Sequence, residues 1–210
     1  MIRLDMPQGS PEWLDARCGI PTASRFDQIL TPVTHKRSKS ADGYLNELIA
    51  ERLLGASIDT HANEAMLRGI DLQDQAHKYY EFQRDCTAEL VGHCLRNDGM
   101  AGCSPDALVG DNGGLEIKCR EAKGHVALMR AVSSGDDVPR EYTLQIQGSL
   151  WITERDWWDF LGYHDALESV LIRVHRDEEL ISKIETEVLR FAATLKHETD
   201  RLGNRFDIAV

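Results

Sequence analysis

The segment SPDALVGDNGGLEIKC, residues 104–119, carries acidic and basic side chains at a spacing that can support chemistry. Glu116 and Lys118 lie two residues apart on a predicted strand, so their side chains point to the same face. The turn-forming sequence DNGG predicts a hairpin, which would bring Asp106, where the preceding strand begins or bends, beside Glu116. Ile117 is expected to point into the core while its backbone carbonyl stays near the charged side chains.

Two convergent carboxylates and a backbone carbonyl make an oxygen-rich site that suits Mg²⁺ or Mn²⁺. A bound metal ion would polarise a phosphate and stabilise the leaving oxygen, and Lys118 would position or deprotonate the attacking water. A solvated hairpin with a surface Glu–Lys pair would have a similar sequence. Two features favour a buried strand: Leu115 and Ile117 bracket the charges, and Pro105 fixes the chain before Asp106. The pattern therefore predicts hydrolysis of a phosphodiester.

Helices and short strands are predicted around this segment from the spacing of apolar residues and from turn signals. The expected helices cover residues 10–17, a short stretch after Thr22, and residues 40–54, 63–84, 125–133, 139–153 and 177–202. Three or four short strands are expected within 86–119, and two more at 157–163 and 169–175. The basic segment 31–39 is expected to be a loop. This order predicts one mixed α/β domain over residues 1–210.

The composition is that of an ordinary globular protein, with 42% apolar and 28% charged residues among 210. No apolar stretch is long enough to span a bilayer, and the first residues lack the apolar core of a signal peptide, so we expect a cytosolic protein with no membrane partner. Five cysteines without a C-x-x-C pair predict neither a disulfide framework nor a structural zinc site.

The net charge of −11 lowers the expectation of non-specific DNA coating, but the acidity is uneven along the chain. Residues 31–40 hold three basic side chains and no acid, whereas residues 154–210 hold 13 acids and 8 bases. A local basic strip can still guide a phosphodiester backbone. Lys36 and Arg37 are therefore candidate DNA-guiding residues, with an ordinary solvated loop as the equal alternative.

Four motifs in consistent order between residues 10 and 160 resemble the phage lambda-type exonucleases. These motifs are WLDARCGIPTAS (13–24), SPD (104–106), LEIKC (115–119) and LQIQGSLWIT (144–153). The lambda-type exonucleases belong to the YqaJ-like viral recombinase branch of the PD-(D/E)xK nuclease superfamily. The resemblance implies a restriction-endonuclease-like α/β core, in which a central mixed sheet is flanked by helices. It also implies a homotrimeric ring that degrades one strand of linear duplex DNA from its 5′ end with Mg²⁺, two ions being expected and Mn²⁺ able to substitute. A single-strand annealing protein is the implied partner, in phage or prophage recombination within the bacterial host.

The resemblance also implies roles for individual residues. Asp106, Glu116 and the carbonyl of Ile117 correspond to metal ligands, Lys118 to the catalytic lysine, and Gln145 to an active-site glutamine one helix turn from Tyr142. Arg17 and Ser24 correspond to residues that hold the 5′-terminal phosphate. Both make physical sense, because arginine offers a bidentate fork for a phosphate and Ser24 lies near a predicted helix start, where backbone N–H groups attract anions. The alternatives are helix capping for Ser24 and a salt bridge of Arg17 with Asp15 or Glu12.

One position departs from the family pattern, which places a glutamate four residues after a helical glycine as a further metal ligand. Here the fourth residue after Gly69 is Gln73. Its amide oxygen could bind a metal ion but carries no charge, so a second metal ion would be held more weakly. Asp74 projects about a quarter-turn away, and His77 shares the face of Gln73.

Other functions remain open at this stage. Among nucleases, the chain could be an endonuclease of the same superfamily or an iron–sulfur-bearing RecB-like exonuclease, although the scattered cysteines argue against a cluster. It could also be a DNA-end-binding module whose catalysis has decayed, with Gln73 as the first lost ligand. It could also be an unrelated acidic α/β enzyme, although it lacks a phosphate-binding glycine loop and a nucleophile elbow.

Overall fold

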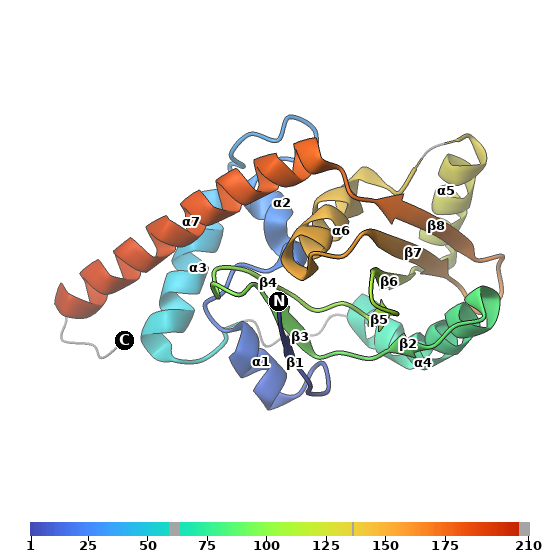
Figure 1. Cartoon of the computed structure of the whole chain (residues 1–210), viewed down its shortest axis with the longest axis horizontal. Helices are drawn as coiled ribbons and strands as arrows, with labels where there is room; N and C mark the ends of the chain where they lie inside the picture. Colours follow the sequence, from blue (N-terminus) through green and yellow to red (C-terminus); the bar gives the residue numbers. More distant parts are fainter. Residues whose placement is uncertain (59–63, 136, 206–210) are drawn as a thin grey trace.

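The computed structural model describes residues 1–58, 64–135 and 137–205, which form two sheets and a set of surrounding helices (Figure 1). The helices are α1 (Pro11–Arg17), the 3₁₀ turn η1 (Ala23–Arg25), α2 (Phe26–Ile29), α3 (Ala41–Leu54), α4 (Glu64–Arg84), α5 (Ala122–Ser133), α6 (Arg140–Thr153) and α7 (Glu178–Arg205). The strands are β1 (Ile2–Leu4), β2 (Ala88–Glu89), β3 (His93–Leu95), β4 (Gly102–Cys103), β5 (Ala107–Val109), β6 (Gly113–Cys119), β7 (Trp157–Tyr163) and β8 (Val170–His175).

The larger sheet has the strand order β2-β5-β6-β7-β8, and only the β6–β7 pair is parallel. Hairpins join β5 to β6 and β7 to β8, while α5 and α6 make the long crossover from β6 to β7. Gly113 and Gly114 lie directly opposite Trp157 and Trp158. A Cβ at either glycine would lie 2.3 Å or less from an indole carbon, so this part of β6 has to be glycine.

The two faces of this sheet pack against different helices. On one face, Leu115 and Ile117 of β6 pack with Ala76 and Tyr80 of α4. On the other face, aromatic residues of β7 such as Phe160 join a larger core with α5 and α6. Because side chains alternate along a strand, Glu116 and Lys118 project toward the α6 side.

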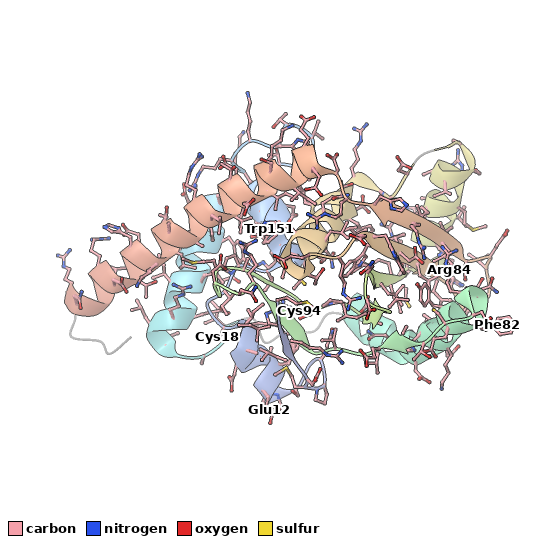
Figure 2. All side chains as sticks on the ribbon, in the orientation of Figure 1. Glu12, Cys18, Phe82, Arg84, Cys94 and Trp151 are labelled. Atoms are coloured by element: carbon pink, nitrogen blue, oxygen red, sulfur yellow. The ribbon has the colours of Figure 1, made fainter. Side chains whose placement is uncertain are left out.

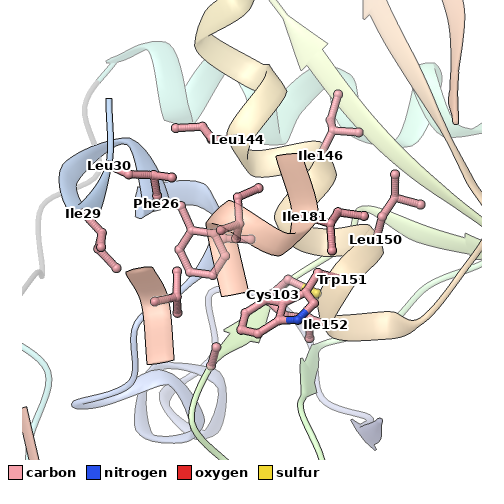
Figure 3. Packing of buried hydrophobic residues seen from close by; sticks show 14 of the residues in the cluster. Phe26, Ile29, Leu30, Cys103, Leu144, Ile146, Leu150, Trp151, Ile152 and Ile181 are labelled. Carbon is pink, nitrogen blue, oxygen red and sulfur yellow. The ribbon is translucent and has the colours of Figure 1, made fainter. Parts of the chain in front are cut away.

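The smaller sheet, β1-β3-β4, lies beside this core. It connects the N-terminal segment to residues 86–119, called the hairpin region below. The long helix α7 crosses the molecule diagonally and packs on α3, α2 and α6 (Figure 1). Figure 3 shows Phe26 of α2 packed beside Trp151 of α6, with ring centroids 6.2 Å apart. Leu144, Ile146 and other residues of α6 complete this packing, so α6 is held firmly in the core.

A few side chains at the outer end of α4 face away from the core. Figure 2 shows Phe82 at this edge of the molecule, and its side chain is exposed. The neighbouring Arg84 instead turns toward the sheet and donates to the buried Asp159 of β7. None of the helices within the described residues is long and apolar enough to cross a bilayer.

The mixed α/β fold class and the predicted helices are confirmed, with bounds within a few residues of those expected. Asn63, the expected start of the fourth helix, lies outside the described residues. The expected number of strands within 86–119 was wrong, because this segment forms five strands in two different sheets. The helix after Thr22 is a 3₁₀ turn followed by one α-helical turn, and the Thr22 side chain does not cap it.

Candidate active site

The centre of the candidate site lies on β6 and on the connection that leads into β5. Glu116 is almost fully buried, with 3% of its surface exposed, and Lys118 lies next to it on the same face of the strand. The Lys118 Nζ is 2.6 Å from Glu116 Oε1. The two nearby carboxylates of Glu116 and Asp106 raise the pKa of Lys118 above its usual value, against the opposing effect of burial.

Asp106 lies at the start of β5, where the hairpin brings it against β6. Its Oδ2 accepts a hydrogen bond from the Ile117 backbone N–H at 2.6 Å, and its Oδ1 accepts one from Gln73 Nε2 at 2.8 Å. Burial and the nearby charge of Glu116 raise the pKa of Asp106 to about 7. The hairpin therefore brings two carboxylates close enough to repel each other, and a cation between them would relieve that repulsion.

The helix α6 supplies the fourth polar group. Gln145 Nε2 donates to Glu116 Oε1 at 2.6 Å, and its neighbours Leu144 and Ile146 are buried. One turn earlier, the ring centroid of Tyr142 lies 5.1 Å from Lys118 Nζ. The core packing of α6 thus fixes the distance between these side chains and β6.

The donor set fits a divalent metal ion of the Mg²⁺ type, which prefers oxygen ligands. The carboxylates of Asp106 and Glu116 are bonded to N–H groups of Gln73, Gln145, Lys118 and the backbone, and both glutamines could turn an amide oxygen toward a cation. Within the described residues, no group of three or more His, Cys, Asp and Glu side chains could hold a metal ion. Any ion bound here would therefore depend on two carboxylates and neutral oxygen ligands.

A cleft with a volume of about 750 Å³ lies beside Asp106. Its lining includes Asp106, Gln73 and His77 of α4, together with residues 5–8 and 90–92. The His77 ring bonds the Ala88 carbonyl at 2.9 Å, so it serves to join α4 to β2. The volume is in the range of small-molecule binding sites and leaves room for a nucleotide next to Asp106.

Arg17, at the end of α1, lies in a second polar cluster. Its Nη1 donates to Ser104 Oγ at 3.1 Å, and its Cζ lies 4.1 Å from the ring centroid of Trp13. Among the described residues it pairs with no carboxylate, so the expected alternative of a salt bridge with Asp15 or Glu12 is absent there. Burial lowers the pKa of this guanidinium, which means that a bound anion would stabilise its charge.

Ser104 is the centre of this cluster, a position to which the sequence did not assign a role. Its hydroxyl accepts from Arg17 and from Trp13 Nε1, and it lies 2.9 Å from His93 Nδ1. Burial and Arg17 lower the pKa of His93 to about 3, so this ring is neutral. Because the Ser104 oxygen already accepts two hydrogen bonds, its hydroxyl is left to donate to His93 Nδ1. Because Ser104 precedes Asp106 by two residues, one short segment contacts both Arg17 and the β6 site. The position of Ser104 in the S-P-D motif, two residues before Asp106, was the sequence feature that could have indicated its role.

The other predicted DNA-binding residues lie on η1 and on the segment between α2 and α3. Ser24 is exposed on the 3₁₀ turn, where its hydroxyl lies 3.4 Å from Thr22 Oγ1. Lys36 and Arg37 are exposed on the segment between α2 and α3, and Arg37 pairs with Asp42 at 2.6 Å. Figure 1 shows this segment at the edge of the molecule near α2 and α7, away from β5 and β6. The structure therefore does not bring the basic segment to the carboxylates.

Comparisons with known proteins identify the family of the chain and solved structures that share its fold. The family described as the YqaJ-like viral recombinase domain matches residues 12–156. A crystal structure of LHK-Exo in complex with dAMP is 35% identical, with a TM-score of 0.82, and the match covers 94% of this chain and 98% of that chain. A second structure of this alkaline exonuclease, from Laribacter hongkongensis, is 34% identical over the same shares of both chains, also with a TM-score of 0.82.

A more distant structure, a phage-related exonuclease from Haemophilus somnus 129PT, shares the fold. It is 18% identical, with a TM-score of 0.62, and the match covers 89% of this chain and 96% of that chain. No curated protein matches the sequence.

Proposed function

The chain belongs to the YqaJ-like viral recombinase family, and from that premise we propose that it is a Mg²⁺-dependent exonuclease acting on linear duplex DNA. The proposed polarity is 5′→3′, which leaves a 3′ single-stranded tail for recombination by strand annealing, and residues 1–210 act as one nuclease domain. The observation that carries the proposal is the contact of Asp106, Glu116, Lys118 and Gln145 in one site. The similarity to alkaline exonucleases supports it.

In this mechanism Asp106, Glu116 and the carbonyl of Ile117 would hold one metal ion, and Gln73 would add its amide oxygen for a second. A metal ion held by these residues would polarise the scissile phosphate and stabilise the leaving oxygen. Lys118 orients the attacking water and stabilises the negative charge that develops on the phosphate. Gln145 keeps the Glu116 carboxylate in place through its 2.6 Å hydrogen bond.

The polarity rests on Arg17. Its guanidinium has no carboxylate partner among the described residues and is fixed by Ser104 and Trp13, so it is prepared to bind an anion. We propose that this anion is the 5′-terminal phosphate, with Ser24 as an additional contact from the 3₁₀ turn. Because Ser104 lies two residues from Asp106, a phosphate at Arg17 would place the next phosphodiester near the carboxylates.

Linear duplexes that carry a 5′-phosphate on only one strand test this function. With Mg²⁺, the wild-type protein should release nucleotides from the phosphorylated strand and leave the other strand and closed circles intact. An Arg17→Gln variant should lose roughly tenfold or more of the preference for 5′-phosphate over 5′-hydroxyl ends, because the guanidinium is the charged partner of that phosphate.

Gel analysis of each end-labelled strand gives the readout, and Arg190→Gln on the exposed surface of α7 is the matched control. Cutting of circles would indicate an endonuclease. Binding of DNA ends without cleavage in Mg²⁺ or Mn²⁺ would indicate a decayed, end-binding module.

A further inference from the structure

The row of side chains on β6 continues past the end of the strand. Arg120 follows Glu116 and Lys118 at the same two-residue spacing, and its Nη2 donates to Tyr142 Oη at 2.8 Å. The Arg120 Cζ and the Lys118 Nζ each lie 5.1 Å from the Tyr142 ring centroid. Tyr142 of α6 therefore holds two cationic side chains next to each other, one inside the candidate site and one beyond it.

A cleft of about 570 Å³ opens at this position between β6, α5 and α6. The side chains of Lys118, Arg120 and Lys123 contribute three positive charges to its lining, against the two carboxylates of Glu121 and Glu141. The lining thus carries one more basic than acidic side chain, with Lys118 also paired with Glu116 of the candidate site, in a chain whose net charge is −11. A local positive cleft in an acidic protein attracts anions to one place rather than to the whole surface.

Glu141 pairs with Arg120, but it is a weakly held partner. Its side chain is 61% exposed, whereas that of Arg120 is 21% exposed and is fixed by the Tyr142 hydroxyl. An exposed ion pair contributes little free energy, so a phosphate could replace Glu141 as the partner of Arg120 at low cost. A guanidinium offers a phosphate two parallel N–H donors.

Arg17 and Arg120 are the first and last residues of a series of contacts that passes through the candidate site. A series of contacts runs from Arg17 to Ser104, then along the chain to Asp106, and from Asp106 to β6. The strand β6 then leads through Lys118 to Arg120. A DNA strand that starts at Arg17 and crosses the carboxylates would therefore continue toward Arg120.

We propose that Arg120 and Lys123 bind the phosphate immediately 3′ of the scissile phosphate. This inference rests on the proposed function and adds a second anchor to it, on the downstream side of the cleavage point. Arg120 acts as a substrate-positioning residue, and Glu141 is the counter-ion that it exchanges for DNA. The strand is then held on both sides of the carboxylates, so the scissile phosphate is fixed between two arginines.

A duplex with a fluorescent first nucleotide on its 5′-phosphorylated strand tests the proposal. Single-turnover release of that nucleotide is measured at increasing protein concentration. The protein concentration that gives half of the maximal rate, the half-saturating concentration, reports how tightly the duplex is bound. Replacing the phosphate 3′ of the scissile one by a neutral methylphosphonate should raise this concentration roughly tenfold for the wild type, as loss of a charge-assisted bidentate contact would. Arg120→Gln should raise it by a similar factor on natural DNA and should be nearly insensitive to the methylphosphonate.

Variants of Glu141 and Lys123, each with a control on α7, separate this contact from a general change of charge. Glu141→Gln should lower the half-saturating concentration a few-fold, because it removes the competing carboxylate, whereas Glu179→Gln on α7 should change it much less. Lys123→Gln should raise it by a smaller factor than Arg120→Gln. Arg190→Gln is the matched control for loss of an arginine from an exposed surface ion pair.

The proposal would be overturned if Arg120→Gln and the methylphosphonate weakened binding independently, so that their factors multiplied. It would also be overturned if Glu141→Gln behaved like Glu179→Gln. In both cases wild-type nucleotide release would still support the exonuclease function. A wild-type protein that released no nucleotide would contradict that function and this inference together.

Discussion

Asp106 is the residue whose chemistry depends most on its surroundings. Burial and Glu116 raise its pKa to about 7, while the Ile117 N–H and Lys118 oppose that shift. The folded metal-free protein therefore keeps a proton on Asp106 between about pH 4 and pH 7, where the unfolded chain has released it. A group that binds more protons in the folded state makes the protein less stable as the pH rises.

The first prediction follows from this fall in stability with rising pH. In EDTA, the free energy of unfolding of the wild type should fall by about 1–3 kcal/mol more between pH 4.5 and pH 8 than that of Asp106→Asn. Urea unfolding at pH 4.5 and pH 8 measures the free energy of unfolding of each variant. Asp200→Asn at the far end of α7 is the control. Equal pH dependence of wild type and Asp106→Asn would contradict the raised pKa.

Mg²⁺ binding should depend on pH through the same carboxylate. A metal ion binds the ionised form, so binding below pH 7 must release a proton. The apparent Mg²⁺ affinity should therefore fall by up to about tenfold per pH unit as the pH drops from 7 to 5. Calorimetric titration in two buffers of different ionisation enthalpy would count the released protons, and a pH-independent affinity would exclude Asp106 as a ligand.

At the scale of the elements, the sheet is joined to α4 by a buried carboxylate. Asp159 of β7 is fully buried and accepts from Tyr80 Oη at 2.9 Å, from Arg84 Nε at 3.1 Å and from Arg173 at 2.8 and 2.9 Å. This cluster connects α4, β7 and β8 on the sheet that carries Glu116. It keeps α4, and with it Gln73, at a fixed place beside Asp106.

Asp159→Ala should lower the free energy of unfolding by about 2–4 kcal/mol, since it leaves two arginines and a tyrosine hydroxyl without their partner. Chemical denaturation measures this loss. Asp200→Ala removes an exposed carboxylate paired with Lys196 and should cost less than about 1 kcal/mol. Similar losses in both variants would mean that the buried cluster contributes no more than a surface ion pair.

The elements also show what local sequence can and cannot predict. Helices such as α3 and α7 follow from apolar periodicity because they are long and bury one face. The two-residue strands β2 and β4 are too short to show alternation, and β1 pairs with β3 some 90 residues away. No local signal divides the hairpin region between two sheets.

The same distinction holds for the candidate site. Asp106, Glu116 and Lys118 were predictable because one hairpin joins them within thirteen residues. Gln145 comes from α6 and was assigned only by resemblance. The Arg17–Ser104 contact joins residues 87 positions apart, so the role of Ser104 could be inferred only once the fold was known.

At the scale of the whole molecule, the net charge of −11 conflicts with tight electrostatic binding of DNA. We propose that a homotrimeric ring resolves this conflict, because a ring around the duplex keeps the enzyme on DNA by topology. Processive digestion should then persist in salt that abolishes initial binding, since topology is not screened. The length of DNA digested in the presence of heparin, which captures any protein that dissociates, measures processivity before and after the salt is raised. Rapid loss of processivity in salt, or a monomer by light scattering, would contradict the ring.

The central claim is that Lys118 and its two carboxylates carry out the cleavage. Its most direct test is single-turnover release of the first nucleotide from a 5′-phosphorylated duplex by the wild type and by Lys118→Met. We predict that the variant binds DNA ends within about threefold of the wild type but cleaves at least about a hundredfold more slowly, because it lacks the charge that acts on the phosphate. Cleavage by Lys118→Met at the wild-type rate would contradict the account.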